Sequence, residues 1–174
     1  MTRKKGAFLR RWRVWLALGL MALLTACASG PKLVTHAFSF NGFNDKWAQS
    51  VDLLAYSYGD QYRMVQDQAP EGKTVGAQSG VNGTIPLGDF LYVKWRVKAT
   101  GEVLEQRVDL RDRLPRDMTD HELTFVIDGR QLYVYVVTPT VQTPWGKTPT
   151  HRTWKSAFRV TREIFPTLEN SPEK

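Results

Sequence analysis

The three histidines of the chain, His36, His121 and His151, are the first residues to consider for metal binding or acid–base chemistry. They lie far apart, no HExxH motif joins any two of them, and the only cysteine, Cys27, lies near the N-terminus. Zinc sites in proteins are usually built from closely spaced His and Cys ligands. We therefore expect no metal site and no metal cofactor.

Sequence motifs typical of nucleophilic and phosphate-binding enzymes are also missing. No serine stands in a G-x-S-x-G motif, and Gly72, Gly76, Gly80 and Gly83 are spaced as turns rather than as G-x-G-x-x-G. The run 120–122 reads Asp-His-Glu, but neighbours in an extended or turn segment point in different directions. The sequence therefore predicts no catalytic residue and no cofactor.

The positive charge of the chain is concentrated at its N-terminus. The sequence holds 24 Lys+Arg and 17 Asp+Glu, a net charge of +7, but residues 1–27 contain six basic residues and no acidic one. The remaining residues hold 18 basic and 17 acidic side chains, a net charge of +1. A near-neutral body gives no electrostatic reason to expect a nucleic-acid partner.

The N-terminal residues have the layout of a secretory signal peptide. A basic stretch, residues 1–13, precedes an uncharged apolar run, residues 14–24. Eleven helical residues at about 1.5 Å each cover only about half of a ~30 Å hydrocarbon core, too little for a transmembrane helix. We expect a signal peptide at residues 1–26.

The end of this run resembles the lipobox of bacterial lipoproteins, with the sequence Leu24-Thr25-Ala26-Cys27. The resemblance implies cleavage between Ala26 and Cys27, diacylglycerol on the Cys27 sulfur and acylation of the new amino group. Several acyl chains hold a protein on a bilayer effectively permanently. Ala28 and Ser29 follow, and the absence of Asp at the second mature position favours the outer membrane, periplasmic face. Residues 27–34 form a lipidated tether.

Two features of the mature region suggest binding to another protein. Residues 138–153 form a proline-rich stretch in which Trp145 stands between Pro144 and Gly146. Loops of this length are often functional, and an exposed Trp is a typical interface anchor; the other interpretation is that Trp145 caps the core. A run of mixed charges that includes Arg111 and Arg113 is either a solvated strand end or a charge-patterned partner surface.

The segment 90–110 predicts the clearest β-hairpin. Apolar residues at 91, 93, 95, 97 and 99 alternate with polar ones, the period of a half-buried strand. A two-residue loop at 100–101 would pair Val97 with Leu104 and Arg96 with Glu105. It would also place Lys94 opposite Arg107, a like-charge pair that costs a little.

A second hairpin is predicted around Asp128-Gly129. Leu123, Phe125 and Ile127 then share a face with Leu132, Val134 and Val136; Val126 shares the other face with Tyr133, Tyr135 and Val137. Moving the loop to 129–130 changes partners but not faces. Because both faces are largely apolar, we expect a central strand pair with its tyrosine hydroxyls at a rim.

Further strands are predicted at residues 35–40, 51–58, 61–65 and 158–165, and short helical turns could occupy 44–50 and 117–122. The fold class is therefore mainly β: an antiparallel sandwich or small barrel of about seven strands. We expect one domain, residues 35–168, and a flexible tail, residues 169–174. Without a cysteine beyond Cys27, packing alone must hold it together.

These observations favour a non-enzymatic, protein-binding lipoprotein of the cell envelope. Two versions fit equally: an envelope accessory, and an immunity-type inhibitor of a periplasmic toxin. The residues expected to carry binding are Trp145, Arg111, Arg113, Tyr133 and Tyr135. The alternative is an envelope enzyme or small-ligand binder, with a cavity lined by residues such as Tyr133, Tyr135 and His121.

Overall fold

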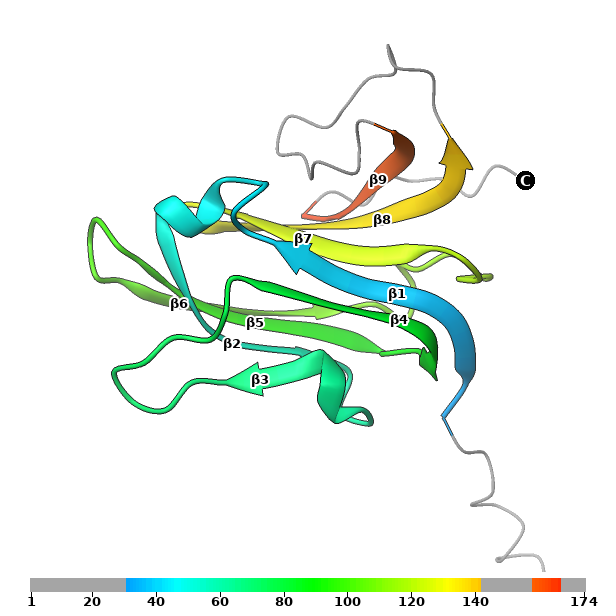
Figure 1. The fold of residues 1–174 in the computed structure, drawn as a ribbon, viewed down its shortest axis with the longest axis horizontal. Helices are drawn as coiled ribbons and strands as arrows, with labels where there is room; N and C mark the ends of the chain where they lie inside the picture. The colour runs from blue at the N-terminus through cyan, green and yellow to red at the C-terminus, as the bar shows by residue number, and fades with distance from the viewer. Residues whose placement is uncertain (1–30, 142–157, 167–174) are drawn as a thin grey trace, which may run out of the picture. The chain divides into compact units, whose positions relative to one another are not determined.

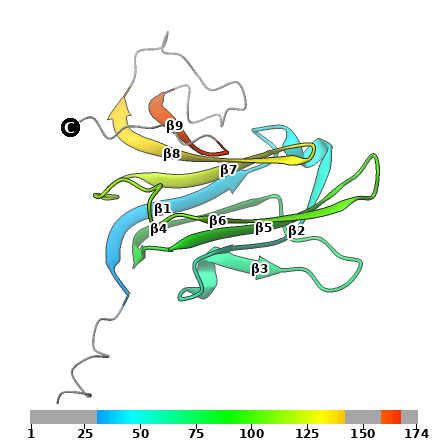
Figure 2. The ribbon, with the colours of Figure 1, turned by 180° about the vertical axis from the view of Figure 1, so that it is seen from behind.

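The chain folds as a β-sandwich. A computed structural model describes residues 31–141 and 158–166, and all its strands lie within a unit that comprises residues 33–174. A five-stranded sheet has the order β4-β1-β7-β8-β9 and a four-stranded sheet the order β3-β2-β5-β6; Figure 1 and Figure 2 show the two layers from opposite sides. The prediction of a mainly β fold is confirmed, and the architecture is the sandwich rather than the barrel.

The described residues form nine strands and two short 3₁₀ turns. These elements are β1 (Leu33–Asn41), η2 (Trp47–Gln49), β2 (Val51–Tyr58), η3 (Arg63–Val65), β3 (Gln66–Gln68), β4 (Gln78–Pro86), β5 (Phe90–Val97), β6 (Val103–Asp109), β7 (Glu122–Asp128), β8 (Gln131–Val141) and β9 (Arg159–Phe165).

Alternating burial explains why the two sheets pack on each other. Phe38, Phe40 and Phe125 from one sheet meet Tyr56 and Tyr58 from the other in a cluster of aromatic rings. The ring centroids of Phe40 and Phe125 lie 4.6 Å apart, and those of Phe38 and Tyr58 lie 5.2 Å apart. Edge-to-face and offset contacts of this kind add to the free energy gained by burying the rings.

The predicted β5–β6 hairpin is present, with the faces expected, but its register is shifted by two residues. Lys94 pairs with Glu105 instead of Arg107, and Trp95 pairs with Leu104. The loop has four residues rather than two: Val97 N–H donates to Glu102 O, and the amides of Thr100 and Gly101 donate to Val97 O. Gly101 has a φ of +73°, a conformation that favours glycine, and so it can close this longer loop. In the resulting register, Lys94 lies opposite the acidic Glu105 rather than the basic Arg107.

The β7–β8 hairpin has its loop at 129–130, the second of the two positions predicted, with Asp128 opposite Gln131. β7 lies in the middle of its sheet, between β1 and β8, and all its residues except Asp128 are buried. The expected central strand pair is therefore confirmed. Its pairing with β1 is parallel, Ala37 opposite Glu122, which the prediction of an antiparallel sandwich did not include.

Three local predictions were wrong. Residues 61–65 are not a strand: η3 occupies Arg63–Val65, and the strand β3 follows it. Residues 117–122 hold no helix but a single hydrogen-bonded turn, in which His121 N–H donates to Met118 O and Asp120 has a φ of +58°. Gly80 and Gly83 lie within β4, which pairs with β1 over nine residues, so these glycines are strand residues rather than turns. The predicted helical turn at 44–50 is present as η2.

Candidate functional site

The outer face of the four-stranded sheet carries an ordered set of charged side chains. Because Val93 and Trp95 point into the core, strand alternation turns Tyr92, Lys94 and Arg96 of β5 outward. The neighbouring strands add acidic and basic residues to the same face. We call this set the polar face: Asp52, Tyr92, Lys94, Arg96, Lys98, Glu105, Arg107 and Asp109.

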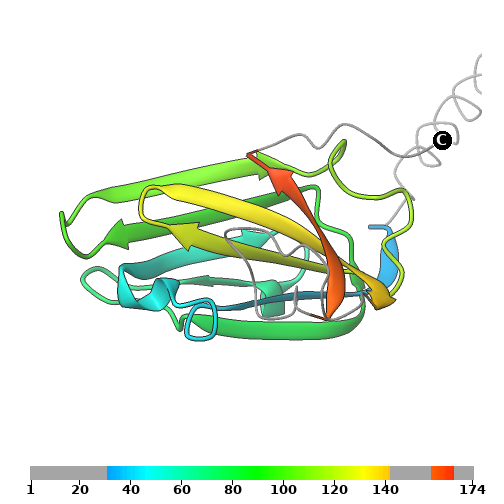
Figure 3. The same ribbon diagram turned by 90° about the horizontal axis from the view of Figure 1, so that it is seen from above.

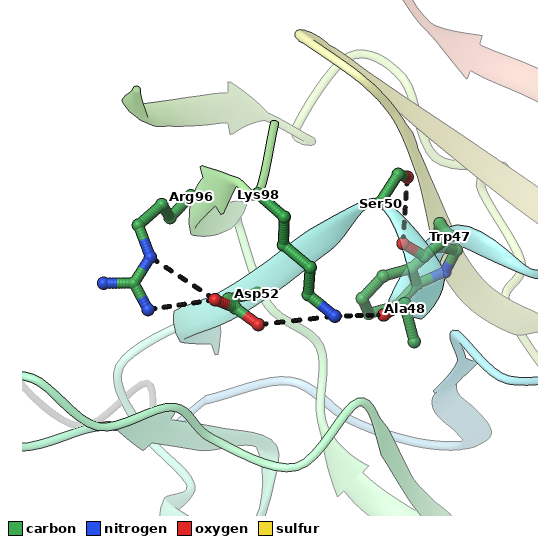
Figure 4. A network of polar contacts seen from close by, with 6 residues as sticks. All are labelled: Trp47, Ala48, Ser50, Asp52, Arg96 and Lys98. Carbon is green, nitrogen blue, oxygen red and sulfur yellow. Dashed lines mark hydrogen bonds and ion pairs between the residues drawn. The ribbon is translucent and has the colours of Figure 1, made fainter. Parts of the chain in front are cut away.

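Asp52 is the centre of one network on the polar face (Figure 4). Its Oδ2 accepts hydrogen bonds from Arg96 Nη2 at 2.9 Å and Nε at 3.3 Å. Lys98 Nζ lies 3.6 Å from Oδ1 and donates to Ala48 O at 2.7 Å. Two cations thus surround one carboxylate, which leaves a local excess of positive charge at this end of the sheet.

Glu105 is the centre of a second network. Its Oε2 accepts a hydrogen bond from the Tyr92 hydroxyl at 2.7 Å and lies 3.6 Å from Lys94 Nζ. Partial burial, together with the Glu105 carboxylate, raises the pKa of Tyr92 to about 12. Beside it, the Arg107 guanidinium lies 3.3 Å from the centroid of the Phe90 ring, a cation–π contact.

A shallow groove runs along the polar face. β2 has an irregularity between Leu53 and Ala55, and the backbone beyond β3 bonds to it, with Ala69 N–H donating to Leu54 O at 2.8 Å and Val75 N–H to Leu53 O at 2.9 Å. Its volume is about 240 Å³, below the roughly 300–1,000 Å³ of typical small-molecule pockets. The lining residues are Leu54, Ala55, Gln68, Ala69, Pro70, Glu71, Gly72, Lys73, Tyr92, Lys94 and Arg96.

The two predicted binding arginines do different things. Arg111 is exposed and forms an ion pair with Asp109 at the end of β6, which lowers the pKa of that carboxyl. Arg113 Nη1 donates to Ile164 O at 2.7 Å, and its guanidinium lies 5.6 Å from the Phe165 ring centroid. Arg111 therefore extends the polar face, whereas Arg113 ties its loop to β9.

Tyr133 and Tyr135 lie on the other sheet, away from the polar face. Tyr135 is fully buried, and its hydroxyl has no hydrogen-bond partner among residues 31–141 and 158–166, so the expectation that its hydroxyl would lie at a rim was wrong. Burial, then the charge of Glu163, raises the pKa of Tyr135. Tyr133 is only partly buried. The predicted ligand cavity was to be lined by Tyr133, Tyr135 and His121. None of these three residues lines the groove on the polar face.

The described histidines have structural surroundings. His36 is buried; its Nδ1 donates to Val34 O at 2.9 Å, and its Nε2 accepts from the Tyr58 hydroxyl at 2.9 Å. His121 Nδ1 lies 2.8 Å from Thr119 O, and Glu122 accepts a hydrogen bond from Ser39. The side chains of His121 and Glu122 therefore have separate partners. Among residues 31–141 and 158–166, no three His, Cys, Asp or Glu side chains form a group suited to a metal ion.

The remaining predicted site residues, Ala26, Cys27 and Trp145, lie outside the described residues. Within the described part of the chain, no helix is long and apolar enough to cross a bilayer. The sequence reasoning missed Asp52 as a site residue. The sequence did indicate such a residue indirectly. Arg96 and Lys98 both lie at outward positions, and two neighbouring cations favour a carboxylate on the adjacent strand.

Comparison with known proteins adds no relative: no family model, no curated protein and no solved structure matches this chain.

Proposed function

We propose that this chain is a lipid-anchored, non-enzymatic protein of the bacterial cell envelope that binds another protein through the polar face. The observation that carries the binding proposal is the arrangement of the polar face itself. Charges of both signs are held in fixed positions by ion pairs on a rigid sheet. Such patterning supplies specificity and a fast association rate to protein complexes.

The groove supports a macromolecular partner over a small molecule. Its volume is below that of typical small-molecule pockets, and its lining holds three cations, Lys73, Lys94 and Arg96, against the carboxylate of Glu71. Lys94 and Arg96 also form ion pairs with carboxylates of the polar face, which leaves Lys73 as the lining cation without an ion pair among the described residues. A loop of a partner with acidic side chains fits these features. The partner belongs either to the envelope of the same cell, as for an accessory protein, or to a delivered toxin, as for an immunity protein.

The anchor is supported by the lipobox-like sequence that ends at Cys27. β1 begins at Leu33, so only residues 28–32 separate this cysteine from the first strand. At no more than about 3.5 Å per residue, that spacer holds the domain within a couple of nanometres of the bilayer. We place the protein at the outer membrane, facing the periplasm.

The binding proposal is tested by affinity capture on the tagged full-length protein in detergent, from envelope extract and separately from proteins secreted by neighbouring strains. The test variant is Lys73→Glu, which reverses a charge at the groove rim. The matched control is Arg159→Glu, an exposed arginine on β9 of the other sheet.

We expect one stoichiometric partner, retained by the control and lost by Lys73→Glu, with binding repeated for the purified pair. A secreted toxin as that partner would identify an immunity protein. A partner that binds both variants equally would contradict the assignment of the site. Capture of no partner from either source would contradict the binding function.

The anchor has a separate test. Cys27→Ser is expected to abolish incorporation of labelled fatty acid and to leave the uncleaved precursor. Normal processing and membrane retention of this variant would contradict lipidation.

A further inference from the structure

The outer edge of the four-stranded sheet is the strand β6, whose outward backbone groups make no backbone hydrogen bond in the part of the chain that the structure describes; the carbonyl of Arg107 accepts from Gln106 Nε2 at 3.4 Å. β6 is the last strand of its sheet, paired on one side with β5 (Figure 3). Val97 with Glu102 and Asp89 with Leu110 are hydrogen-bonded at the two ends of this ladder. Because antiparallel pairs alternate, the odd-numbered residues of β6, 103 to 109, direct their N–H and C=O groups away from β5. An edge of this kind is a template for another strand.

The sequence of β6, Val-Leu-Glu-Gln-Arg-Val-Asp, is self-complementary about Gln106. If a second copy pairs antiparallel with Gln106 opposite Gln106, each Glu105 faces the other copy's Arg107. Each Leu104 then faces a Val108. The two central pairs of the outer row thus match opposite charges, and on the inner row an apolar pair lies on each side of the Gln106 pair.

The registers centred one residue or half a residue away fail on the same residues, and one centred on Val108 would match Arg107 with Asp109 only in competition with the Asp109–Arg111 ion pair. A pairing centred between two residues would place outer side chains opposite inner ones and break both layers of the sandwich. A pairing centred on Glu105 sets two carboxylates against each other, and one centred on Arg107 sets two guanidinium groups against each other. In the register centred on Gln106, the free odd-numbered residues form the hydrogen-bonded pairs, as the ladder requires.

We propose that β6 pairs with β6 of a second copy of this chain, centred on Gln106, to form a two-fold symmetric dimer with a continuous eight-stranded sheet. The contacts already present on the polar face favour it. Glu105, held by Tyr92 and Lys94, would gain Arg107 of the second copy as another cation. Arg107, stacked on Phe90, would keep that contact and gain a carboxylate. The dimer goes beyond the proposed function and does not depend on the anchor.

The first test is disulfide formation at the symmetry axis. Gln106→Cys would place two thiols in a non-hydrogen-bonded pair, with Cα atoms about 4.5 Å apart, within the range that a disulfide spans. We expect the full-length variant in detergent to form a covalent dimer under mild oxidation. Asn82→Cys, at an exposed position on the edge strand β4, and the unmodified chain with Cys27 alone are the controls. A dimer band no stronger than in these controls would overturn the proposal.

The second test uses charge reversal and sedimentation of the full-length protein. Arg107→Glu and Glu105→Arg each place like charges opposite each other twice, and each is expected to weaken dimerisation by roughly tenfold or more. A mixture of the two variants restores opposite charges in every pair and is expected to recover the dimer. Because a single chain cannot provide this recovery, its failure, with both variants folded by circular dichroism, would overturn the proposal.

Discussion

The buried His36–Tyr58 pair predicts a specific loss of stability in mild acid. Burial lowers the pKa of His36 below its ordinary value of 6.5, although the bond to Val34 O opposes the shift. As the pH falls below about 6.5, the unfolded chain takes up a proton on this histidine while the folded chain does not. Stability from the neutral His36 is therefore present above pH 6.5 and is lost as the pH falls toward the folded pKa.

The size of the effect follows from one proton. When only the unfolded state is protonated, the free energy of unfolding falls by about 1.4 kcal/mol for each pH unit. Protonation of Nε2 in the folded state would also remove the acceptor that the Tyr58 hydroxyl uses. Because the unfolded histidine is already half protonated at pH 6.5, we expect the unfolding free energy to decrease by up to about 1 kcal/mol between pH 6.5 and 5.5 through this residue alone.

The assay is urea unfolding, followed by tryptophan fluorescence, at several pH values between 7.5 and 5. His36→Gln keeps a donor and an acceptor at the site but removes the titration, so its stability should depend less on pH than that of the wild type. His121→Gln is the control: the His121 ring lies 2.8 Å from the neighbouring Thr119 O, outside the core, so this variant should keep the wild-type dependence. Equal pH dependence in the wild type and His36→Gln would refute the reasoning.

Three further changes test the packing and the polar face by thermal or urea unfolding. Gly88→Ala would place a Cβ 2.6 Å from the Tyr58 ring and should cost about 1–3 kcal/mol, whereas Gly76→Ala, with no atom nearer than 3.7 Å, should cost less. Equal costs would contradict the close approach. Phe125→Ala removes the centre of the aromatic cluster and should lower stability by about 3–5 kcal/mol; a loss under 1 kcal/mol would be inconsistent with that packing. Asp52→Asn, at a part-exposed ion pair, should cost no more than about 1 kcal/mol, and a larger loss would show that the network supports the fold.

The hairpins show what the sequence pattern determines. Alternation identified the inner and outer residues of β5, β6, β7 and β8, because a side chain keeps its face whenever the register moves by two residues. It did not determine the loop between β5 and β6. That loop depends on the left-handed conformation of Gly101, which the residue types do not reveal.

The sequence analysis did not predict the strand β4, because its residues do not show the alternation of a half-buried strand. Gly80 and Gly83 interrupt its pattern, and its outward residues are polar without being charged, so the segment has little intrinsic preference for a strand. Backbone pairing with β1 over nine residues stabilises β4 as a strand despite this weak preference. The polar face was missed likewise, since Asp52 and Arg96 meet only through the pairing of β2 with β5.

The position of β1 has a consequence for how the chain acquires its structure. This strand comes first among the described strands, yet it pairs with β4 and with the distant β7, so its partners are synthesised after it. Contacts between residues far apart in sequence close slowly, because a long loop must be ordered before they are gained. The five-stranded sheet therefore cannot form vectorially from its N-terminal end. Until β7 is synthesised, β1 lacks its parallel partner, and Phe40 lacks the Phe125 ring against which it packs.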